Sequence, residues 1–306
     1  MASVDVVIPC YQHGCFLRDC VLSVLKQDVA ELRILIIDNA STDDSAEVAL
    51  QLAKEDARVQ ASIHPVNLGP HASFNEGVDW AASDYLMILC SDDLLAPGAL
   101  PHMIAALERH PDAAFAYGND THWVMGQPRP KLSVPGSAPS WHIRDGRDFI
   151  VERCRKPESY IAAGMVLTRT SAHKAAGHYR PELPHTDDFE MLLRLACLGR
   201  VARTDAVVGI KRMHGQNRTN DFLAQRTRDL CERLAALDSF FSREGRGLFD
   251  SQRLLRLGRR SIAERAYWCG VKDLGRGRRS ALELLRLAVR LHPVVAVVPP
   301  FGYLFR

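Results

Sequence analysis

Several common signatures are missing from this chain of 306 residues, and each absence narrows its function. Its eight cysteines form no C-x-x-C pair, so neither a zinc ribbon nor a disulfide framework is indicated. No G-x-G-x-x-G follows the first apolar stretch and no G-x-x-x-x-G-K-[ST] occurs, so the Rossmann and P-loop phosphate sites lack their core feature. A divalent metal held by carboxylates is the remaining common way to bind a diphosphate.

Targeting signals are absent as well. No apolar run approaches the roughly 20 residues that a membrane-spanning helix needs. The N-terminus leads directly into the apolar stretch Val4–Ile8 without the basic segment of a signal peptide. We therefore expect a cytoplasmic protein, placed at the inner face of the membrane if its C-terminal part binds lipid.

The charge pattern bears on two kinds of acidic partner, nucleic acid and membrane phospholipid. A formal net charge of +3 is too small to indicate nucleic acid, and we expect none as a partner. From Arg243 onward, however, arginine greatly outnumbers aspartate and glutamate. This asymmetry indicates a basic C-terminal surface, for which membrane phospholipid is a plausible acidic partner.

Apolar and amphipathic stretches alternate in the first half of the chain. The apolar stretches predict strands at Val4–Ile8, Leu32–Ile37, Val59–Ile63 and Tyr85–Leu89, with helical patterns between them. This order predicts an α/β fold with a mostly parallel sheet and helices on both faces. Beyond Phe222 the pattern is nearly all helical. We therefore expect an α/β domain over residues 1–220 and a helical region over residues 221–306.

Two adjacent carboxylates, Asp92 and Asp93, follow the last of these strands. A carboxylate at the end of a buried strand has to reach water, a cation or hydrogen-bond donors. In open α/β sheets, ligands bind beyond the carboxyl ends of the strands. We therefore expect Pro9–Tyr11, Asp38–Asn39 and Ser91–Asp93 to line one binding edge. A plain strand-to-helix turn is the alternative for the two carboxylates.

Four segments of the chain resemble the family 2 glycosyltransferases of the GT-A fold. They are VDVVIPCYQHGCFLRDCVLSVLKQ, LRILIIDNASTDDS, NLGPHASFNEGVDWAASDYLMILCSDD and HTDDFEMLLRLACLG, and they follow the order of the family from about Val4 to Asn217. The resemblance implies a GT-A type α/β/α sandwich whose catalytic domain is residues 1–220. It also implies a nucleotide-sugar donor, a divalent ion (Mg²⁺ or Mn²⁺) and transfer with inversion at the anomeric carbon. The Q-x-x-R-W motif of processive synthases is absent, which favours the addition of a single sugar.

The resemblance implies roles for individual residues. Asp188, in the stretch that matches the family's ED motif, would be the catalytic base. Asp92 matches the last acidic residue of the metal-binding D-x-D motif, with Asp93 beside it, and His214 stands where many members have a late histidine that reaches the site. The residues implied to contact the donor are Pro9, Tyr11, Asp38, Asn67, Gly69, Asn75, Ser91 and Asp92.

The chain also departs from the family. Cys90 stands where members often have aspartate, and a protonated thiol is a poor ligand for Mg²⁺ or Mn²⁺. Asn39 replaces a frequent second aspartate, so UDP-, dTDP- and GDP-linked donors all stay open. The helix macrodipole alone would explain the acidic pair at Asp187 and Asp188. His214 has an alternative too, as an ordinary surface or partly buried histidine.

We expect an inverting, metal-dependent glycosyltransferase that moves one sugar to a hydroxyl of a glycan or lipid-linked acceptor in cell-surface polysaccharide synthesis. In such a transfer a dication stabilises the departing diphosphate, and a carboxylate accepts the proton of the attacking hydroxyl. The alternative is a non-catalytic scaffold of the same fold that binds sugar nucleotides or glycans, and Cys90 is its best support. A nucleotidyltransferase usually needs a basic, glycine-rich N-terminal loop, and Pro9–Gly14 contains no lysine or arginine.

The C-terminal segment combines charge with apolar side chains. Arg276–Arg279 is basic, and the stretch Pro293–Phe301 that follows the last helical pattern is apolar. Basic residues beside an apolar, aromatic end suit contact with a membrane surface. A helical lid and a homodimer interface are the alternatives.

Overall fold

The computed structural model describes residues 2–132, 140–217 and 225–305, with only the backbone for 304 and 305. The chain divides into two compact units, each described by itself below. The first comprises Met1–Gly146, Ile161–Arg180 and Leu198–His214, and the second Arg147–Tyr160, Pro181–Cys197 and Gly215–Arg306. The boundary expected between residues 220 and 221 lies outside the described residues, as do the first residues of the helical pattern expected from Phe222. The division into a catalytic domain and a helical region stays a prediction.

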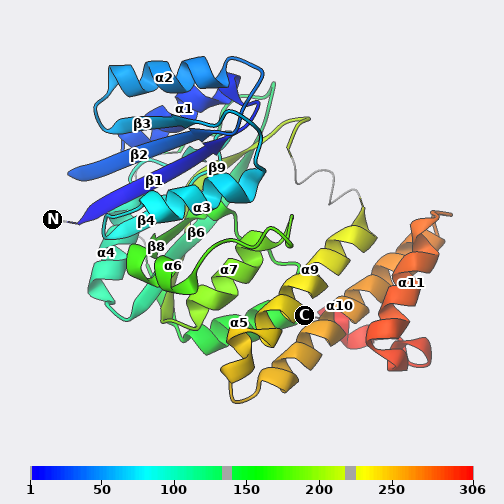
Figure 1. Cartoon of the computed structure of the whole chain (residues 1–306). Helices are drawn as coiled ribbons and strands as arrows, with labels where there is room; N and C mark the ends of the chain where they lie inside the picture. The colour runs from blue at the N-terminus through cyan, green and yellow to red at the C-terminus, as the bar shows by residue number, and fades with distance from the viewer. Residues whose placement is uncertain (1, 133–139, 218–224, 306) are drawn as a thin grey trace. The chain divides into compact units, whose positions relative to one another are not determined.

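One sheet of nine described strands forms the core of the first unit (Figure 1). Its order is β3-β2-β1-β4-β8-β6-β9-β5, and β7 pairs with β9. The strands are β1 (Ser3–Cys10), β2 (Glu31–Asp38), β3 (Val59–Ile63), β4 (Tyr85–Ile88), β5 (Leu94–Leu95), β6 (Ala113–Val124), β7 (His142–Arg144), β8 (Val166–Arg169) and β9 (Arg200–Met213). The neighbours among β1 to β4 pair in parallel, as do β6 and β9, while β5, β7 and β8 run antiparallel to the strands they pair with. The mostly parallel sheet expected from the sequence is confirmed.

Helices cover both faces of the sheet. Successive side chains of a strand point to opposite sides, and the apolar side chains of β1 on both sides are buried. Helices α1 (Gly14–Leu25), α2 (Ser45–Glu55) and α4 (Ala99–Arg109) contribute to one apolar core with Val4, Val6 and Ile8 of β1. Helix α3 (Pro70–Trp80) packs on the other face, where Val7 points, beside α6 (Thr170–Ala176). A Cβ atom at Gly77 would lie 2.3 Å from Val7 Cγ1, so only glycine permits this close approach of α3.

A buried carboxylate fastens the amino ends of the central strands. Asp5 in β1 is fully buried and accepts hydrogen bonds from Arg33 Nε at 2.8 Å and Arg33 Nη2 at 2.7 Å. The backbone N–H groups of Ala82 and Ser83 also donate to it. Burial alone would raise the pKa of Asp5, but these hydrogen bonds hold it below the ordinary value. Asp5 is therefore ionised and fully satisfied although it is buried, while the Arg33 side chain that pairs with it is 41% exposed.

The carboxyl ends of β1, β2, β3 and β4 meet at one edge of the sheet. The turn after β1 contains Gln12 in the left-handed region, with φ 59°, and its N–H donates to Ser41 Oγ at 2.9 Å. Strand β5 pairs antiparallel with β9, with Leu94 opposite Ile210. This pairing brings the residues just before β5 beside those that end β9, more than 100 positions later in the chain.

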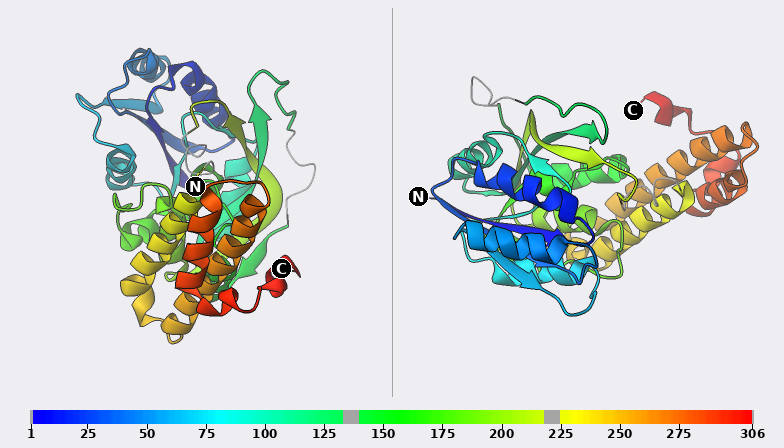
Figure 2. Two further views of the ribbon diagram at one scale, coloured as in Figure 1. Left: turned by 90° about the vertical axis from the view of Figure 1, so that its right-hand side faces the viewer. Right: turned by 90° about the horizontal axis from the view of Figure 1, so that it is seen from above.

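The second unit is helical in the part that the structure describes. Its helices are α5 (Gly146–Arg155), α7 (Asp187–Ala196), α9 (Arg226–Ser242), α10 (Ser251–Leu274) and α11 (Ser280–Leu291), with 3₁₀ turns η2 (Glu244–Gly247), η3 (Pro293–Ala296) and η4 (Phe301–Phe305). A further turn, η1 (Ala163–Met165), precedes β8 in the first unit. Helices α10 and α11 lie side by side, as both views of Figure 2 show. Among the described helices, none combines the length and the apolar character needed to cross a membrane.

Candidate metal and donor site

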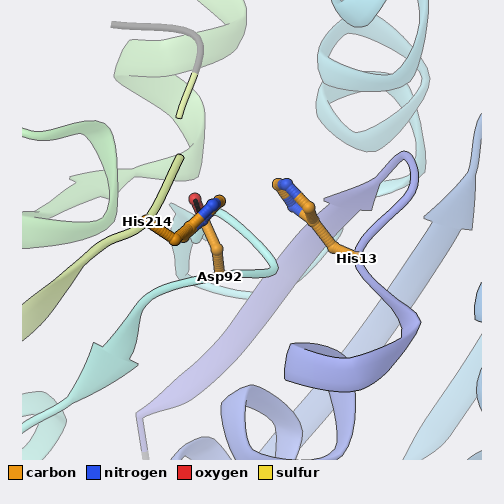
Figure 3. A group of neighbouring side chains, drawn as sticks. All are labelled: His13, Asp92 and His214. Carbon is orange, nitrogen blue, oxygen red and sulfur yellow. Dashed lines mark hydrogen bonds and ion pairs between the residues drawn. The ribbon is translucent and has the colours of Figure 1, made fainter. Parts of the chain in front are cut away.

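A carboxylate and two imidazoles meet at the carboxyl edge of the sheet. Asp92, just after β4, is 8% exposed, and His214, just after β9, donates from Nε2 to Asp92 Oδ2 at 3.1 Å. Figure 3 shows His13 pointing toward this pair from the turn that follows β1. The ligating atoms of His13, Asp92 and His214 all lie within 4.8 Å of one another.

His13 is not among the site residues predicted from the sequence. Its Nδ1 is hydrogen-bonded to Ser91 Oγ at 3.0 Å, and its ring centroid lies 5.5 Å from that of His214. The backbone N–H of His13 donates to Ser45 Oγ at 3.1 Å, which holds the turn in place. Its position in the sequence could have indicated it as a site residue, since His13 lies in the same polar turn as Tyr11, directly after the first strand.

Burial and neighbouring groups together shift the pKa values of His13, Asp92 and Asp93. Burial lowers the pKa of His13, so the imidazole is neutral and carries a free lone pair near neutral pH. Burial alone would raise the pKa of Asp92, but the hydrogen bond from His214 and the positive charge that both imidazoles carry in acid, when they are protonated, hold it below the ordinary value. Asp93 differs: burial, together with the negative charge of Asp92, raises its pKa well above the ordinary value.

This donor set fits a divalent ion. One ionised carboxylate and two imidazoles suit Mn²⁺ and related transition ions. Cys90, Asp92 and Asp93 form a second group whose ligating atoms also lie within 4.8 Å of one another, but burial raises the pKa of the Cys90 thiol well above its usual value. Asp93 Oδ1 accepts the backbone N–H of Arg212 at 3.0 Å. The group with two histidines is therefore the better ligand set, and the expected ligation by Asp93 stays a prediction.

A buried arginine, Arg212, packs against the aromatic ring that contacts His214. The Arg212 guanidinium is 2% exposed and lies 5.1 Å from the centroid of the Phe16 ring and 5.3 Å from that of Trp123. Its Nη2 lies 3.3 Å from Asp19 Oδ2. The Phe16 ring in turn lies 4.7 Å from the ring of His214. These contacts tie α1, β6 and β9 together and fix the direction of the His214 side chain.

The residues expected to contact the donor base and sugar lie along the same edge. Asp38 is fully buried, and its Oδ2 accepts the N–H of Ser41 at 3.0 Å. Its Oδ1 has no hydrogen-bond partner among the described residues, which is a costly state for a buried acceptor. Tyr11 is 46% exposed, and Ser91 is buried against His13. Pro9, near the end of β1, is half-buried.

Three further predicted contacts lie around the N-terminus of α3. Asn67 Oδ1 accepts the amide of Asn39 at 3.0 Å and the N–H of Gly69 at 2.9 Å. Gly69 adopts φ 83°, a left-handed conformation that favours glycine. Both ends of the Asn75 amide bind the backbone of Tyr179, at 3.0 Å and 2.7 Å, so this side chain anchors a neighbouring segment. Their contacts with a donor stay predictions.

Asp188 belongs to the second unit, at the start of α7. It is half-buried, and its Oδ1 accepts the N–H of Phe189 at 2.6 Å. Helix α9 holds the preceding residues: Thr186 Oγ1 donates to Glu232 O at 3.0 Å, and His185 Nε2 lies 3.2 Å from Asp229 Oδ1. The start of α7 is thus fixed by its own unit, and the role of Asp188 as a base stays a prediction.

A family model and several known proteins match parts of this chain. A family model described as "Glycosyl transferase family 2" matches residues 5–176. An uncharacterized glycosyltransferase of Haemophilus influenzae is 35% identical over 96 residues, covering 31% of this chain and 38% of the relative. A GalNAc(5)-diNAcBac-PP-undecaprenol beta-1,3-glucosyltransferase of Campylobacter jejuni is 28% identical over 120 residues, covering 39% of this chain and 38% of the relative. The chain thus spans less than two fifths of the length of these relatives.

Solved structures agree on the fold. A crystal structure of S. aureus TarS 1-349 is similar with a TM-score of 0.57 at 15% identity, over 96% of this chain and 90% of that one. The mannosyltransferase PcManGT from Pyrobaculum calidifontis, solved with GDP-Man and Mn²⁺, is similar with a TM-score of 0.60 at 16% identity, over 99% of this chain and 85% of that one. The expected GT-A type α/β fold is confirmed.

The ligand set predicts a specific order of manganese affinities. We expect isothermal titration calorimetry to show Mn²⁺ binding that weakens by roughly 10- to 100-fold or more in His13→Gln, since even outer-shell changes at metal sites have effects of that size. Asp92→Asn should abolish binding. Affinity should also fall as the pH is lowered, because protons compete for the imidazole lone pairs.

His122→Gln is the matched control, because His122 lies in β6 with its side chain 62% exposed and outside this group. Unchanged Mn²⁺ affinity in His13→Gln would show that His13 is not a ligand.

Proposed function

Because the chain belongs to glycosyl transferase family 2, we propose that it is an inverting, metal-dependent glycosyltransferase. It moves one sugar from a nucleotide-sugar donor to a hydroxyl of a glycan or lipid-linked acceptor in cell-surface polysaccharide synthesis. The observation that carries this proposal is the buried Asp92 carboxylate between two imidazoles at the ligand-binding edge of the sheet.

His13, Asp92 and His214 would hold the metal ion. When bound there, a divalent ion acts as a Lewis acid on the diphosphate, worth several kcal/mol in the transition state. The ion would displace the proton that joins His214 Nε2 to Asp92 Oδ2. Mg²⁺ prefers oxygen ligands, whereas imidazole suits Mn²⁺, so two histidines favour manganese. The Mn²⁺ in the structurally similar mannosyltransferase supports the same choice.

Asp38 would select the nucleobase. Its buried Oδ1 needs a hydrogen-bond donor, because an unpaired buried acceptor is unfavourable. Uracil, thymine and guanine each carry a ring N–H, whereas the ring nitrogens of adenine and cytosine next to their amino groups are acceptors. The carboxylate therefore favours UDP-, dTDP- or GDP-linked sugars. The exposed ring of Tyr11 is available to pack against the base.

Asp188 would accept the proton of the attacking hydroxyl. The acceptor oxygen forms a bond to the anomeric carbon while the bond from that carbon to the diphosphate oxygen breaks on the opposite face. The proton passes to the Asp188 carboxylate, and the electron pair leaves with the nucleoside diphosphate. A positioned general base typically contributes on the order of 10²–10⁴-fold to the rate.

Replacing this base tests the assignment. We expect Asp188→Asn to lower kcat by roughly 10²- to 10⁴-fold, because the amide cannot accept the proton. Donor binding, followed by the thermal shift that the nucleotide sugar and Mn²⁺ produce, should be retained. Asp205→Asn is the matched control, because this carboxylate is 67% exposed and forms a surface ion pair with Arg203.

Two results would count against the enzyme assignment. Full activity in Asp188→Asn would remove the residue from the chemistry. Tight donor binding without transfer to any acceptor would favour the scaffold alternative, in which the fold binds sugar nucleotides and does not turn them over.

We also infer that the end of the second unit contacts an acidic membrane surface. Val294, Val297, Val298 and Phe301 are 54%, 83%, 58% and 59% exposed. The segment is nevertheless anchored, since Trp268 Nε1 donates to Pro300 O at 3.0 Å. Exposed arginines stand close by in sequence, at positions 278, 279, 286 and 290. A fixed apolar tip beside positive charge suits insertion at the headgroup level of anionic lipid.

Vesicle sedimentation tests this surface. The full chain should bind vesicles containing phosphatidylglycerol and not those of phosphatidylcholine alone, with the bound fraction falling as salt rises. Val297→Asp combined with Phe301→Asp should abolish the binding. Leu50→Asp, a change at an apolar residue of α2 that is 48% exposed, should leave binding intact. If the double variant binds normally, or changes only the oligomeric state, the segment is a dimer interface or another contact.

A further inference from the structure

A chain of hydrogen-bonded side chains joins the carboxyl ends of β2 and β3 to α3. His64, just after β3, places Nδ1 at 3.0 Å from Asn39 Oδ1 and Nε2 at 2.5 Å from Glu76 Oε2. Asn39 Nδ2 donates to Asn67 Oδ1 at 3.0 Å. The side chain of His64 is 9% exposed and that of Glu76 is 36% exposed. None of these contacts takes part in the metal group.

The orientation of both amides is fixed by backbone donors. The N–H of Leu68 donates to Asn39 Oδ1 at 2.9 Å, and the N–H of Gly69 donates to Asn67 Oδ1 at 2.9 Å. A backbone N–H can only donate, so these two side-chain atoms are the carbonyl oxygens of their amides. Asn39 therefore presents an acceptor to His64, and His64 Nδ1 has to carry a hydrogen.

Counting protons then leaves one extra proton in the pair. A neutral imidazole has a single N–H, so a proton on Nδ1 leaves Nε2 as a bare acceptor. The Glu76 carboxylate that faces Nε2 is also an acceptor when ionised, and its other oxygen accepts Ser62 Oγ at 2.7 Å. Two acceptors at 2.5 Å need a hydrogen between them. The pair thus holds one proton more than a neutral histidine beside an ionised glutamate.

We propose that His64 and Glu76 share a retained proton and act as positioning residues for the donor-binding segment Asn67–Gly69. Asn39 transmits their position, because one end of its amide contacts His64 and the other contacts Asn67. The role in donor binding depends on the proposed function, while the shared proton is a property of the chain itself.

Charged residues beside His64 come from β2 and α3. Strand β2 presents Asp38, whose backbone oxygen accepts the N–H of His64 at 2.9 Å, and α3 presents Glu76 itself. Among the described residues, the ion pair that His64 and Glu76 form is the one with each other.

Losing the proton breaks one of the two contacts. A neutral His64 can donate either to Asn39 or to Glu76, but not to both. If Nδ1 loses its hydrogen, two acceptors face each other at Asn39 and the hold on Asn67 loosens. If Nε2 loses it, the imidazole faces a bare carboxylate. Raising the pH should therefore weaken donor binding, whereas turnover of bound donor changes less.

Glu76→Gln provides a sharp test. Glutamine has the same shape but carries N–H donors, so it can donate to a neutral His64 Nε2 while Nδ1 still donates to Asn39. The variant keeps every contact without the extra proton. The donor Kd is measured with Mn²⁺ saturating at every pH, so that protons competing for the metal ligands do not enter. Between about pH 6.5 and about pH 8.5, the donor Kd of the native chain should rise by roughly tenfold, the effect of losing one hydrogen bond to a charged group. In Glu76→Gln it should stay nearly constant. His178→Gln, at a surface pair with Asp79, should behave like the native chain.

Two measurements need no donor. Nitrogen-15 NMR should show both ring nitrogens of His64 protonated near neutral pH in the native chain, or a hydrogen shared with Glu76, and only Nδ1 protonated in Glu76→Gln. Hydrogen exchange of the Leu68 and Gly69 amides, after correction for the intrinsic rise with pH, should accelerate at high pH in the native chain alone.

These measurements distinguish failure of the His64–Glu76 proposal from failure of the proposed function. A single-protonated His64 with an ionised Glu76 in the native chain would overturn the shared proton. An unchanged pH response of exchange and donor Kd in Glu76→Gln would overturn the positioning role. If no nucleotide sugar binds at any pH, the proposed function fails, while the NMR and exchange results still decide whether the pair holds the proton and fixes the segment.

Discussion

The attraction between one buried carboxylate and the positive charge it requires organises the binding edge of this protein. Asp92 is 8% exposed at the end of a parallel sheet, where an unpaired charge would be strongly disfavoured. His214 supplies a proton to it, and His13 approaches from the turn after β1. The proposed catalysis depends on exchanging that proton for a divalent ion. The fold contributes by bringing three distant segments of the chain to one point.

Histidines at this edge have two different tasks. His13 is half-buried, and burial lowers its pKa more than the nearby Asp92 raises it, so a neutral lone pair is available to a metal. His64 lies between an amide oxygen and a carboxylate, and that arrangement requires hydrogens on both sides of its ring or a proton on Glu76. The neighbouring hydrogen-bond acceptors, and not the residue type, decide which of the two tasks a histidine performs.

Features set by local sequence were predictable. Continuous apolar stretches predicted the strands β1 to β4, and the acidic pair after the last of them marked the edge of the sheet where we propose the metal and donor bind. His13 was not found because its contact with Ser91 depends on the side-by-side placement of β1 and β4, which single-residue patterns do not encode. The same holds for His64, whose partners Asn39 and Glu76 lie 25 and 12 positions away. For Asn75 the donor contact implied by its motif position stays a prediction, while the bonds of its amide to the Tyr179 backbone also depend on long-range packing. The grouping of Pro181–Cys197 with the C-terminal helices likewise depends on long-range contacts, such as that from Thr186 to α9.

The position of a bound ion tests the central claim most directly. Anomalous diffraction at the manganese edge, from crystals grown with Mn²⁺ and a nucleoside diphosphate, locates the metal independently of any activity assay. The account predicts a single strong peak in contact with Asp92 and with the imidazoles of His13 and His214. A peak that lies away from these three side chains, or that contacts Cys90 and Asp93 instead, would contradict it.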